Sequence, residues 1–187
     1  GYDAAWMAEA KRRGLANLPN TAAALPAYIL PKNVELMTKH GVYSRSEMLA
    51  RHEIHMEKYC KIISIEAATL VDMVQHSILH AASRYEGVLC QTILQKKQAL
   101  PNADCRVETA LAESILSLNE TLLDDTVALK TALEMTPEGG SAELVSYYHD
   151  TVYALMGKVR ASVDKLETLV AGDYWPYPRY NELLFSV

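Results

Sequence analysis

Residues 104–134 read DCRVETALAESILSLNETLLDDTVALKTALE. Apolar side chains recur in this stretch three, four or seven positions apart, at Leu111, Ile115, Leu118, Leu122, Leu129 and Leu133. Because an α-helix completes a turn every 3.6 residues, this spacing places the apolar side chains along one stripe of a helix. Pro101 before the stretch and the turn-forming residues 136–140 after it bound the helix. The sequence therefore predicts a long amphipathic helix over residues 104–134, with Leu111 and Leu118 in the core.

A longer helix is predicted upstream, over residues 44–99. Ser44 stands three residues before Glu47, so its hydroxyl can cap a free amide while the carboxylate reaches back to another. Apolar residues then recur at helical spacing up to the stop at Pro101: Ile54, Tyr59, Ile62, Ile63, Leu70, Met73, Val74, Ile78, Tyr85, Leu89 and Ile93. A helix of this length is rarely regular throughout, and we expect a kink within residues 77–83.

A third long helix is predicted over residues 141–171, with Ser141 as its cap and Gly172 as its end. Its apolar stripe consists of Val145, Tyr148, Val152, Leu155, Val159, Val163, Leu166 and Val170. Short loops between long helices favour antiparallel neighbours, so the three stripes close a bundle with Val159 in its core. We find no convincing strand, and the predicted fold is all-α: an elongated antiparallel bundle of three long helices.

The two ends of the chain differ from this bundle. Over residues 1–43 we expect an arm with one short helix over 4–13, closed by Gly14, and a second from Pro31, closed by His40 and Gly41. Between them, three prolines predict extended or turn structure over residues 15–31. The predicted domains are therefore the arm, the bundle over 44–172, and a tail over 173–187.

The tail is rich in aromatic residues and contains two prolines, so it cannot continue the helix before it. Aromatic and leucine side chains gathered in a short segment are typical of a segment that packs against another surface. The candidate interaction residues are Trp175, Tyr177, Tyr180, Leu184 and Phe185.

Composition narrows the class of partner. The 187 residues carry a formal net charge of -5 and no run of four or more lysines and arginines, which argues against nucleic acid and anionic lipid as partners. No uninterrupted apolar run approaches the roughly 18 residues of a membrane span. Cys60, Cys90 and Cys105 form no CxxC pair, and three cysteines cannot all pair within one chain, so a reducing, cytoplasmic location is expected.

Few residues point to chemistry. Asp72, His76 and His80 stand four apart on one helix face and are the best metal candidates, but they lack a Glu-x-x-His partner on another helix. The group His52, Glu53, His55 and Glu57 lacks zincin spacing and reads as an ordinary polar helix face. Cys60 is interpreted as a small core residue. No GxSxG motif or glycine-rich phosphate loop occurs, so we expect no catalytic, metal or cofactor site in this chain.

Several stretches resemble the C-terminal region of type III glutamine synthetases. Near the start these are Arg13-Gly14-Leu15, Lys39-His40-Gly41-Val42, Arg51-His52-Glu53-Ile54, Glu57-Lys58-Tyr59-Cys60-Lys61 and Ile65-Glu66-Ala67. Near the end they are Tyr147-Tyr148, Asp150, Val152, Met156, Arg160, Trp175-Pro176-Tyr177-Pro178 and Leu183-Leu184-Phe185-Ser186-Val187. The matches are dense at the two ends of the chain and sparse in the middle helix.

The resemblance implies that a longer parent protein joins ammonia to glutamate, using ATP and Mg or Mn, in a cytoplasmic double-ring dodecamer. In that family the residues that bind metal, ATP and glutamate lie upstream of the matched region. The chain begins with glycine rather than an initiator methionine, which fits an excised C-terminal piece. We therefore expect a structural, assembly-forming domain that contacts the catalytic domain of its own polypeptide. The alternatives are a free-standing helical adaptor and a metal-binding bundle built on Asp72, His76 and His80.

Overall fold

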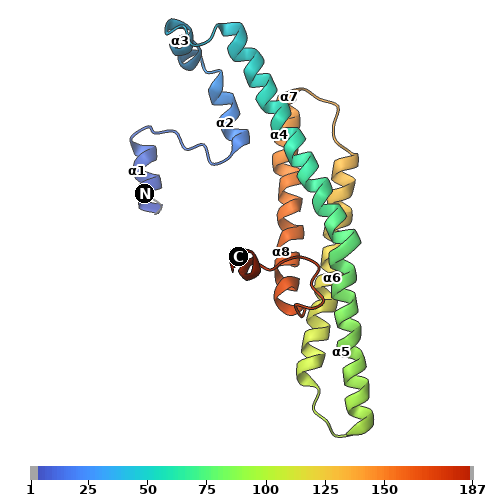
Figure 1. Cartoon of the computed structure of the whole chain (residues 1–187). Helices are drawn as coiled ribbons and strands as arrows, with labels where there is room; N and C mark the ends of the chain where they lie inside the picture. The colour runs from blue at the N-terminus through green and yellow to red at the C-terminus, as the bar shows by residue number, and fades with distance from the viewer. Residues whose placement is uncertain (1–3, 186–187) are drawn as a thin grey trace. The chain divides into compact units, whose positions relative to one another are not determined.

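The structure is a computed structural model that describes residues 4–185, with the side chains of Ala4, Tyr180 and Asn181 left out of that description. Within residues 4–185 no strand occurs, so the prediction of an all-α fold is confirmed. The helical elements, in chain order (Figure 1), are α1 (Ala4–Arg12), α2 (Thr21–Tyr28), α3 (Pro31–Lys39), α4 (Arg45–Met73), η1 (Val74–Ile78), α5 (Leu79–Ala99), α6 (Arg106–Glu134), α7 (Ser141–Tyr147), η2 (Tyr148–Tyr153), α8 (Ala154–Leu169) and α9 (Tyr180–Phe185).

The chain divides into two compact units. Unit 1 comprises Gly1–Ile62 and Glu138–His149, and unit 2 comprises Ile63–Pro137 and Asp150–Val187. Of the three boundaries between the units, one falls inside α4 and one inside η2, where the helix continues through the boundary, and the third falls in the loop between α6 and α7. The predicted segments 1–43, 44–172 and 173–187 follow the helix pattern of the sequence rather than these units, and they remain a prediction.

In unit 1 the predicted start of the long helix is confirmed in atomic detail. The backbone N–H of Ser44 donates to Glu47 Oε2 at 2.7 Å, and the backbone N–H of Glu47 donates to Ser44 Oγ at 3.2 Å. This reciprocal pair satisfies two amides that the first helical turn leaves without carbonyl partners. Both predicted glycine stops are also present, because Gly14 and Gly41 have φ of 72° and 65°, a conformation that favours glycine.

One prediction in the arm is wrong. Residues 21–28, expected to be extended or in turns, form the helix α2 with Pro26 inside it. The side chain of Asn20 caps this helix by accepting the backbone N–H of Ala23 at 2.8 Å. Pro26 costs α2 one backbone hydrogen bond, but Thr21 and the three alanines after it are compatible with a helix of only two turns.

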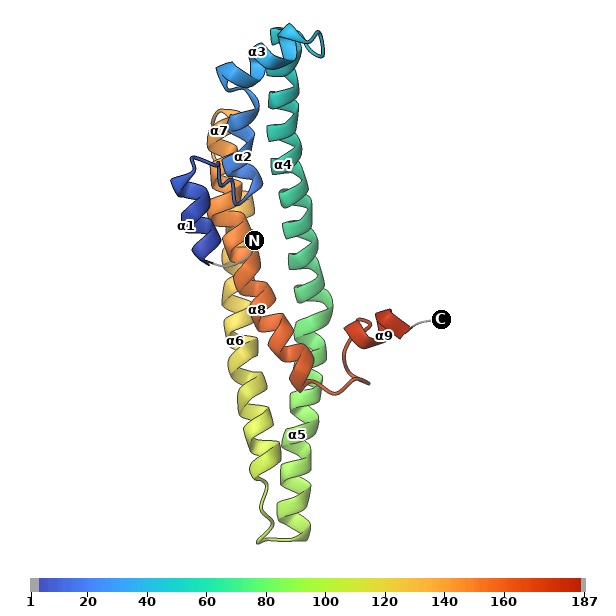
Figure 2. The ribbon, with the colours of Figure 1, turned by 90° about the vertical axis from the view of Figure 1, so that its left-hand side faces the viewer.

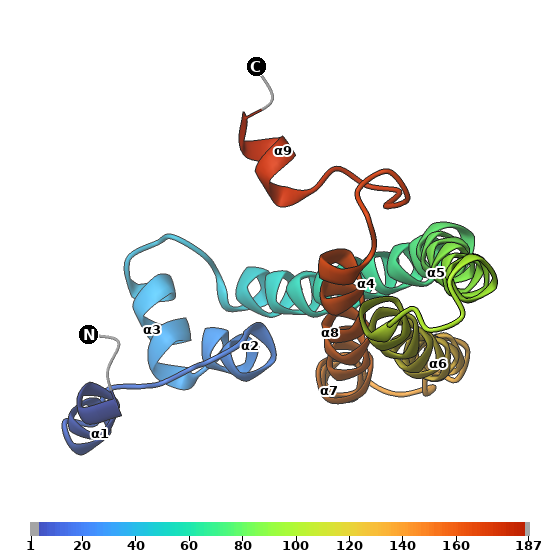
Figure 3. The same ribbon diagram turned by 90° about the horizontal axis from the view of Figure 1, so that it is seen from below.

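Unit 2 is built around α6, which packs against α5 and against α8 (Figures 2 and 3). Two contacts fix the direction of the α5–α6 pair. Lys96 Nζ pairs with Glu108 near the connecting loop, and Asn119 Nδ2 donates to Glu86 Oε2 at 3.5 Å farther along. The earlier residue of α5, Glu86, contacts the later residue of α6, Asn119, and the later residue of α5 contacts the earlier residue of α6. These two helices are therefore antiparallel.

The buried stripe of α6 is Ala112, Ile115, Asn119, Leu122, Thr126, Leu129 and Ala132. Ile115, Leu122 and Leu129 were predicted on it, and the predicted core residue Val159 of α8 is fully buried. Leu111 and Leu118 are only half-buried, so their prediction as core residues is corrected. The stripe admits small and polar residues: the hydroxyl of Thr126 donates to the carbonyl of Leu122 at 2.6 Å, which removes the cost of burying it.

Both interruptions of the long helices are π-helical turns. The turn η1 begins at Val74, three residues before the segment in which we expected a kink, and η2 separates α7 from α8 within the predicted third helix. Single π-turns are rare inside α-helices and occur frequently at functional sites. Ser141 is the first helical residue rather than the cap, since Gly140 precedes the helix and the Ser141 hydroxyl hydrogen-bonds to Glu53.

Helical residues Arg45–Ala99 include an 18-residue window that is long and apolar enough to cross a membrane by length and composition. This is weak support for a membrane span, because the core helix of a soluble protein meets the same criterion. Val71, Val74 and Ile78 of this stretch are buried within the protein, but only 28% of the apolar window is buried. The expectation that the chain has no membrane partner stays a prediction.

Candidate interaction site

The structure brings together two of the three residues of the alternative metal site. His76 Nδ1 lies 2.9 Å from Asp72 Oδ1, and both side chains are more than two-thirds exposed. His80 does not complete the group, because within residues 4–185 no three histidine, cysteine or acidic side chains gather closely enough to hold a metal ion. The π-turn contributes to this result, since residues 76 and 80 straddle its end and are not spaced as in a regular α-helix. The geometry of these residues does not support the alternative of a metal-binding bundle built on Asp72, His76 and His80.

His52 and His55, expected on an ordinary polar helix face, both contact a tyrosine, and His55 remains exposed. The ring of Tyr28, at the end of α2, stacks on His52 at 6.5 Å between centroids and meets His55 edge-on at 5.7 Å. His52 is 9% exposed, so the sequence interpretation of this residue is corrected. These two side chains attach α2 to α4 within unit 1.

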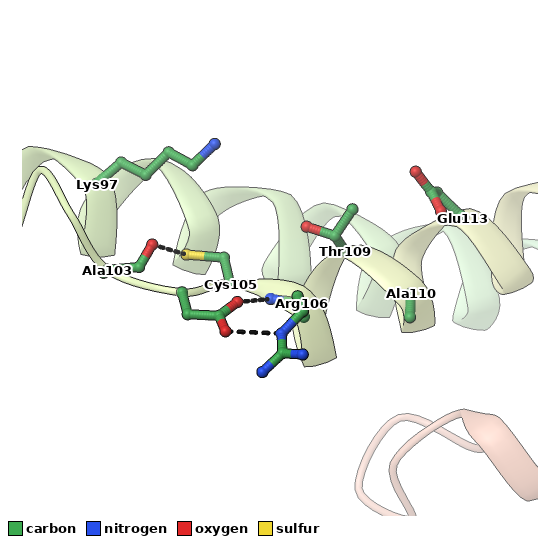
Figure 4. A pocket seen from close by; sticks show the side chains of 8 residues that line it. Lys97, Ala103, Cys105, Arg106, Thr109, Ala110 and Glu113 are labelled. Atoms are coloured by element: carbon green, nitrogen blue, oxygen red, sulfur yellow. Dashed lines mark hydrogen bonds and ion pairs between the residues drawn. The ribbon is translucent and has the colours of Figure 1, made fainter.

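The three cysteines are free thiols. Burial raises the pKa of the Cys60 thiol above its usual value, which disfavours the thiolate that a nucleophile requires. Cys105 is buried beside the loop between α5 and α6, where its Sγ donates to the carbonyl of Ala103 (Figure 4). Neither environment activates sulfur, and Cys60, which was interpreted as a small core residue, is only half-buried.

A shallow hollow of about 540 Å³ opens beside this loop, and Figure 4 shows Lys97, Thr109 and Glu113 along its length. The nearby Lys96–Glu108 pair joins the last turn of α5 to the first turn of α6. The side-chain hydrogen bond between them lowers the pKa of Glu108 and raises that of Lys96. The Lys96–Glu108 pair braces the antiparallel hairpin, and the hollow lies beside the loop that reverses the chain.

The C-terminal tail has an anchored base. The ring of Tyr174 lies 5.4 Å from that of Tyr85 on α5, and Arg179 Nη2 donates to the carbonyl of Val170 at 2.6 Å. Trp175 and Tyr177 between these contacts are half-buried. The Glu182 carboxylate then accepts the backbone N–H of Arg179 at 3.0 Å and caps the helix α9 that follows.

Beyond this base, the tail exposes its apolar side chains. Leu184 is 60% exposed and Phe185 is 79% exposed. The candidate residues therefore fall into two groups, with Trp175 and Tyr177 in the base and Leu184 and Phe185 at the tip. The backbone of Tyr180 belongs to α9, but its predicted interaction role concerns a side chain that lies outside the described residues.

An apolar groove of about 570 Å³ is the second feature of unit 2 that suits interaction. One wall belongs to α4 and consists of Ile65, Glu66, Thr69, Leu70 and Met73. The other wall follows η2 and α8 and consists of Tyr153, Met156, Gly157 and Arg160. Ile65 and Tyr153 are more than half exposed, and Gly157 leaves open space where a side chain would stand.

The apolar periodicity of the sequence did not reveal this groove. Its walls are the edges of the apolar stripes of α4 and α8, which lie about 90 residues apart in the chain. Leu70 and Met73 belong to the predicted apolar stripe of the first long helix, yet they are only half-buried and line the groove. One signal was present in the sequence. Ile65, Glu66, Met156 and Arg160, from the two ends of the family resemblance, meet at this groove.

Comparison of the sequence with known proteins assigns the chain to a family. Residues 1–97 match the family described as glutamine synthetase C-terminal domain. A glutamine synthetase of Butyrivibrio fibrisolvens is 34% identical over 191 residues, covering 100% of this chain and 27% of that protein. A type-3 glutamine synthetase of Dictyostelium discoideum is 32% identical over 194 residues, covering 99% of this chain and 26% of that protein.

A glutamine synthetase of Bacteroides fragilis is 26% identical over 194 residues and is likewise matched over 26% of its length. The chain thus spans about a quarter of each of these relatives while being matched along nearly its whole length. More than half of its residues fall within the family match. The chain belongs to the glutamine synthetase C-terminal domain family.

Proposed function

We propose that this chain is the helical accessory domain of a type III glutamine synthetase and that its role is structural: it stabilises and assembles the parent protein. The parent joins ammonia to glutamate with ATP and Mg or Mn in the cytoplasm, and its catalytic domain and its dodecameric partners are the surfaces this domain contacts. Nucleic acid and membrane are not partners in this proposal. The support is that relatives bearing the name glutamine synthetase are almost four times as long as the matched region.

The observation that carries the proposal is the contrast within the tail. Its base is fixed to α5 and to the end of α8 through Tyr174 and Arg179, while Leu184 and Phe185 at its tip face solvent. Moving a leucine or phenylalanine side chain from water into an apolar contact is worth about 1.5–3 kcal/mol each. An anchored segment that presents such side chains is suited to holding two surfaces together.

Deletion of residues 173–187 from the full-length parent tests this role. We expect a lower thermal midpoint and partial dissociation, measured by scanning calorimetry and by analytical ultracentrifugation. The double variant Leu184→Ser/Phe185→Ser should reproduce the loss without removing the anchored base. Val107→Ser is the matched control, because Val107 is 69% exposed and lies on α6, outside the deleted segment. Unchanged assembly and unchanged thermal midpoint after the deletion would show that the tail has no such role.

We further propose that residues 44–172 form one elongated antiparallel bundle of three long helices, with short N-terminal helices and the tail as appendages. The antiparallel contacts between α5 and α6 and the packing of α6 on α8 support this arrangement. Small-angle X-ray scattering tests it. A compact globule of this length has a radius of gyration of about 16 Å, and an elongated monomer must exceed that value clearly.

A further inference from the structure

We propose that Arg179 is a reversible clasp between the end of α8 and the start of α9. When the clasp is closed, α9 is held in one position relative to α8, and when the clasp opens, α9 is released. The inference concerns the conformation of the chain itself, and only its consequence for assembly rests on the role proposed above.

Arg179 bonds toward both helices at once, through different atoms. Its side chain reaches back nine positions, where Nη2 donates to the carbonyl of Val170 at 2.6 Å. Its backbone N–H donates to the Glu182 carboxylate at 3.0 Å, and its carbonyl accepts the backbone N–H groups of Glu182 and Leu183 in α9. Val170 follows the last residue of α8 and is 1% exposed, so the acceptor belongs to the core. A displacement of Arg179 therefore changes the end of α8 and the start of α9 together.

The end of α8 favours a cation. The last carbonyls of a helix lack backbone partners and carry partial negative charge. The last turn of α8 contains no basic residue, so the helix does not supply this charge itself. The guanidinium of Arg179 supplies it from outside the helix, and a hydrogen bond from a charged donor is stronger than one between neutral groups. The contact with Val170 therefore stabilises the closed clasp.

The closed clasp also has a cost, which makes it reversible. Arg179 Nε is buried and has no hydrogen-bond partner among the residues that the structure describes. A buried donor without a partner has lost the hydrogen bonds that water supplies to it in the open state. Opening restores these bonds to Nε while it breaks the bond to Val170, so the closed and open states lie close in free energy.

A second contact limits what the clasp controls. The Tyr174 ring lies 5.4 Å from the ring of Tyr85 on α5, and the backbone N–H of Tyr174 donates to the carbonyl of Ala171 at 2.9 Å. These contacts do not involve Arg179, so they keep the first half of the tail in place when the clasp opens. The released segment is the second half of the tail, from Pro176 onward.

Gly172 offers a way to change the clasp from the opposite side. A Cβ at Gly172 would lie 3.5 Å from Cζ of Arg179, an ordinary van der Waals distance, so a longer side chain there can reach the guanidinium. Gly172 does not have a positive φ, so its backbone accepts other residues. Gly172→Asp places a carboxylate beside the guanidinium and should tighten the clasp. Gly172→Lys places a like charge there and should open it.

The experiment is hydrogen exchange of the 187-residue chain, measured by mass spectrometry on peptides that cover α9. Arg179→Gln should speed exchange in α9 about tenfold, because a hydrogen bond from a charged group is lost. Gly172→Asp should slow it about threefold and Gly172→Lys should speed it about as much, as expected for partly exposed charge pairs. Arg106→Gln is the matched control, because the Arg106 side chain is 89% exposed and lies on α6.

Combining the substitutions separates a clasp from a general effect of charge. In the Arg179→Gln background, Gly172→Asp should no longer slow exchange, because its partner is absent. Unchanged exchange of α9 in Arg179→Gln overturns the inference, and so does a slowing by Gly172→Asp that persists without Arg179. Equal acceleration of α6 and α9 in Arg179→Gln also overturns it, because Arg179 would then stabilise all of unit 2 rather than hold α9.

Sedimentation velocity of the full-length parent tests the consequence for assembly. Arg179→Gln should cause partial dissociation, because α9 loses its fixed position although Leu184 and Phe185 are retained. If deletion of residues 173–187 dissociates the parent and Arg179→Gln does not, the assembly role stands and does not depend on the clasp. If exchange in the 187-residue chain follows the expected pattern and neither change affects the parent, the clasp stands and the assembly role fails.

Discussion

Two neighbouring leucines of α6 occupy opposite environments. Leu122 is fully buried, whereas Leu123 is 49% exposed. The difference follows from helix geometry, because one residue moves a side chain about 100° around the axis and away from the surfaces of α5 and α8. The burial of an α6 side chain therefore depends on its position around the helix axis and not on its residue type.

This pair yields a matched prediction. Leu122→Ala should lower the free energy of unfolding by about 2–5 kcal/mol, because it removes buried methyl groups and leaves a cavity. Leu123→Ala should change it by no more than about 0.5 kcal/mol. Urea unfolding followed by circular dichroism checks both values. Equal losses for the two variants would mean that Leu123 is covered by another surface in solution.

At the level of elements, the chain uses local signals to begin and end helices. The Ser44–Glu47 pair starts α4, and the backbone N–H of Ser44, followed by its hydroxyl, lowers the pKa of the Glu47 carboxyl. A carboxyl with a lowered folded-state pKa stabilises the folded chain above its unfolded pKa. That contribution is lost as the pH falls through the lowered folded value.

Glu47→Gln should therefore be less stable than the wild type at pH 6, and the difference should shrink as the pH falls below the usual value of 4.5. The measurement is the thermal midpoint between pH 6 and pH 3. Glu57→Gln, an exposed carboxylate on the same helix, serves as the control for a general charge effect. A wild-type advantage that stays constant down to pH 3 would refute the capping role of this carboxylate.

Elements also show where local signals mislead. Three prolines predicted no helix over residues 15–31, yet α2 forms there because Asn20 caps it and because His52 and His55 of α4 hold Tyr28. In α2 a few contacts outweigh the propensity of a short stretch. The tail, predicted only not to continue the helix before it, forms the separate short helix α9 after Pro178.

At the scale of the whole molecule, burial is unequal among the helices. α2 contains no buried residue, whereas α6 contains seven. Amide exchange reports such differences, because helices with few buried contacts open locally at low cost. We expect amides of α2 to exchange with deuterium orders of magnitude faster than those in the middle of α6.

Hydrogen exchange measured by mass spectrometry on the 187-residue chain checks this prediction, with α6 as the internal reference. Dilution is the control, because contacts between copies weaken as concentration falls. Equal protection of α2 and α6 at all concentrations would show that packing within one chain covers α2 more completely than its burial indicates.

The sequence by itself determined that this chain is all-helical, where its long helices begin, which faces of them are apolar and to which family it belongs. These properties depend on period, capping and composition, which act between residues close together in the chain. Only the tertiary structure decided that α2 is a helix, that Leu111 and Leu118 lie at the margin of the core, that Asp72, His76 and His80 do not gather, and that residues near 65 and near 156 line one groove. The physical reason is that these outcomes depend on contacts between segments many residues apart, whose distances and angles are set by packing rather than by local pattern.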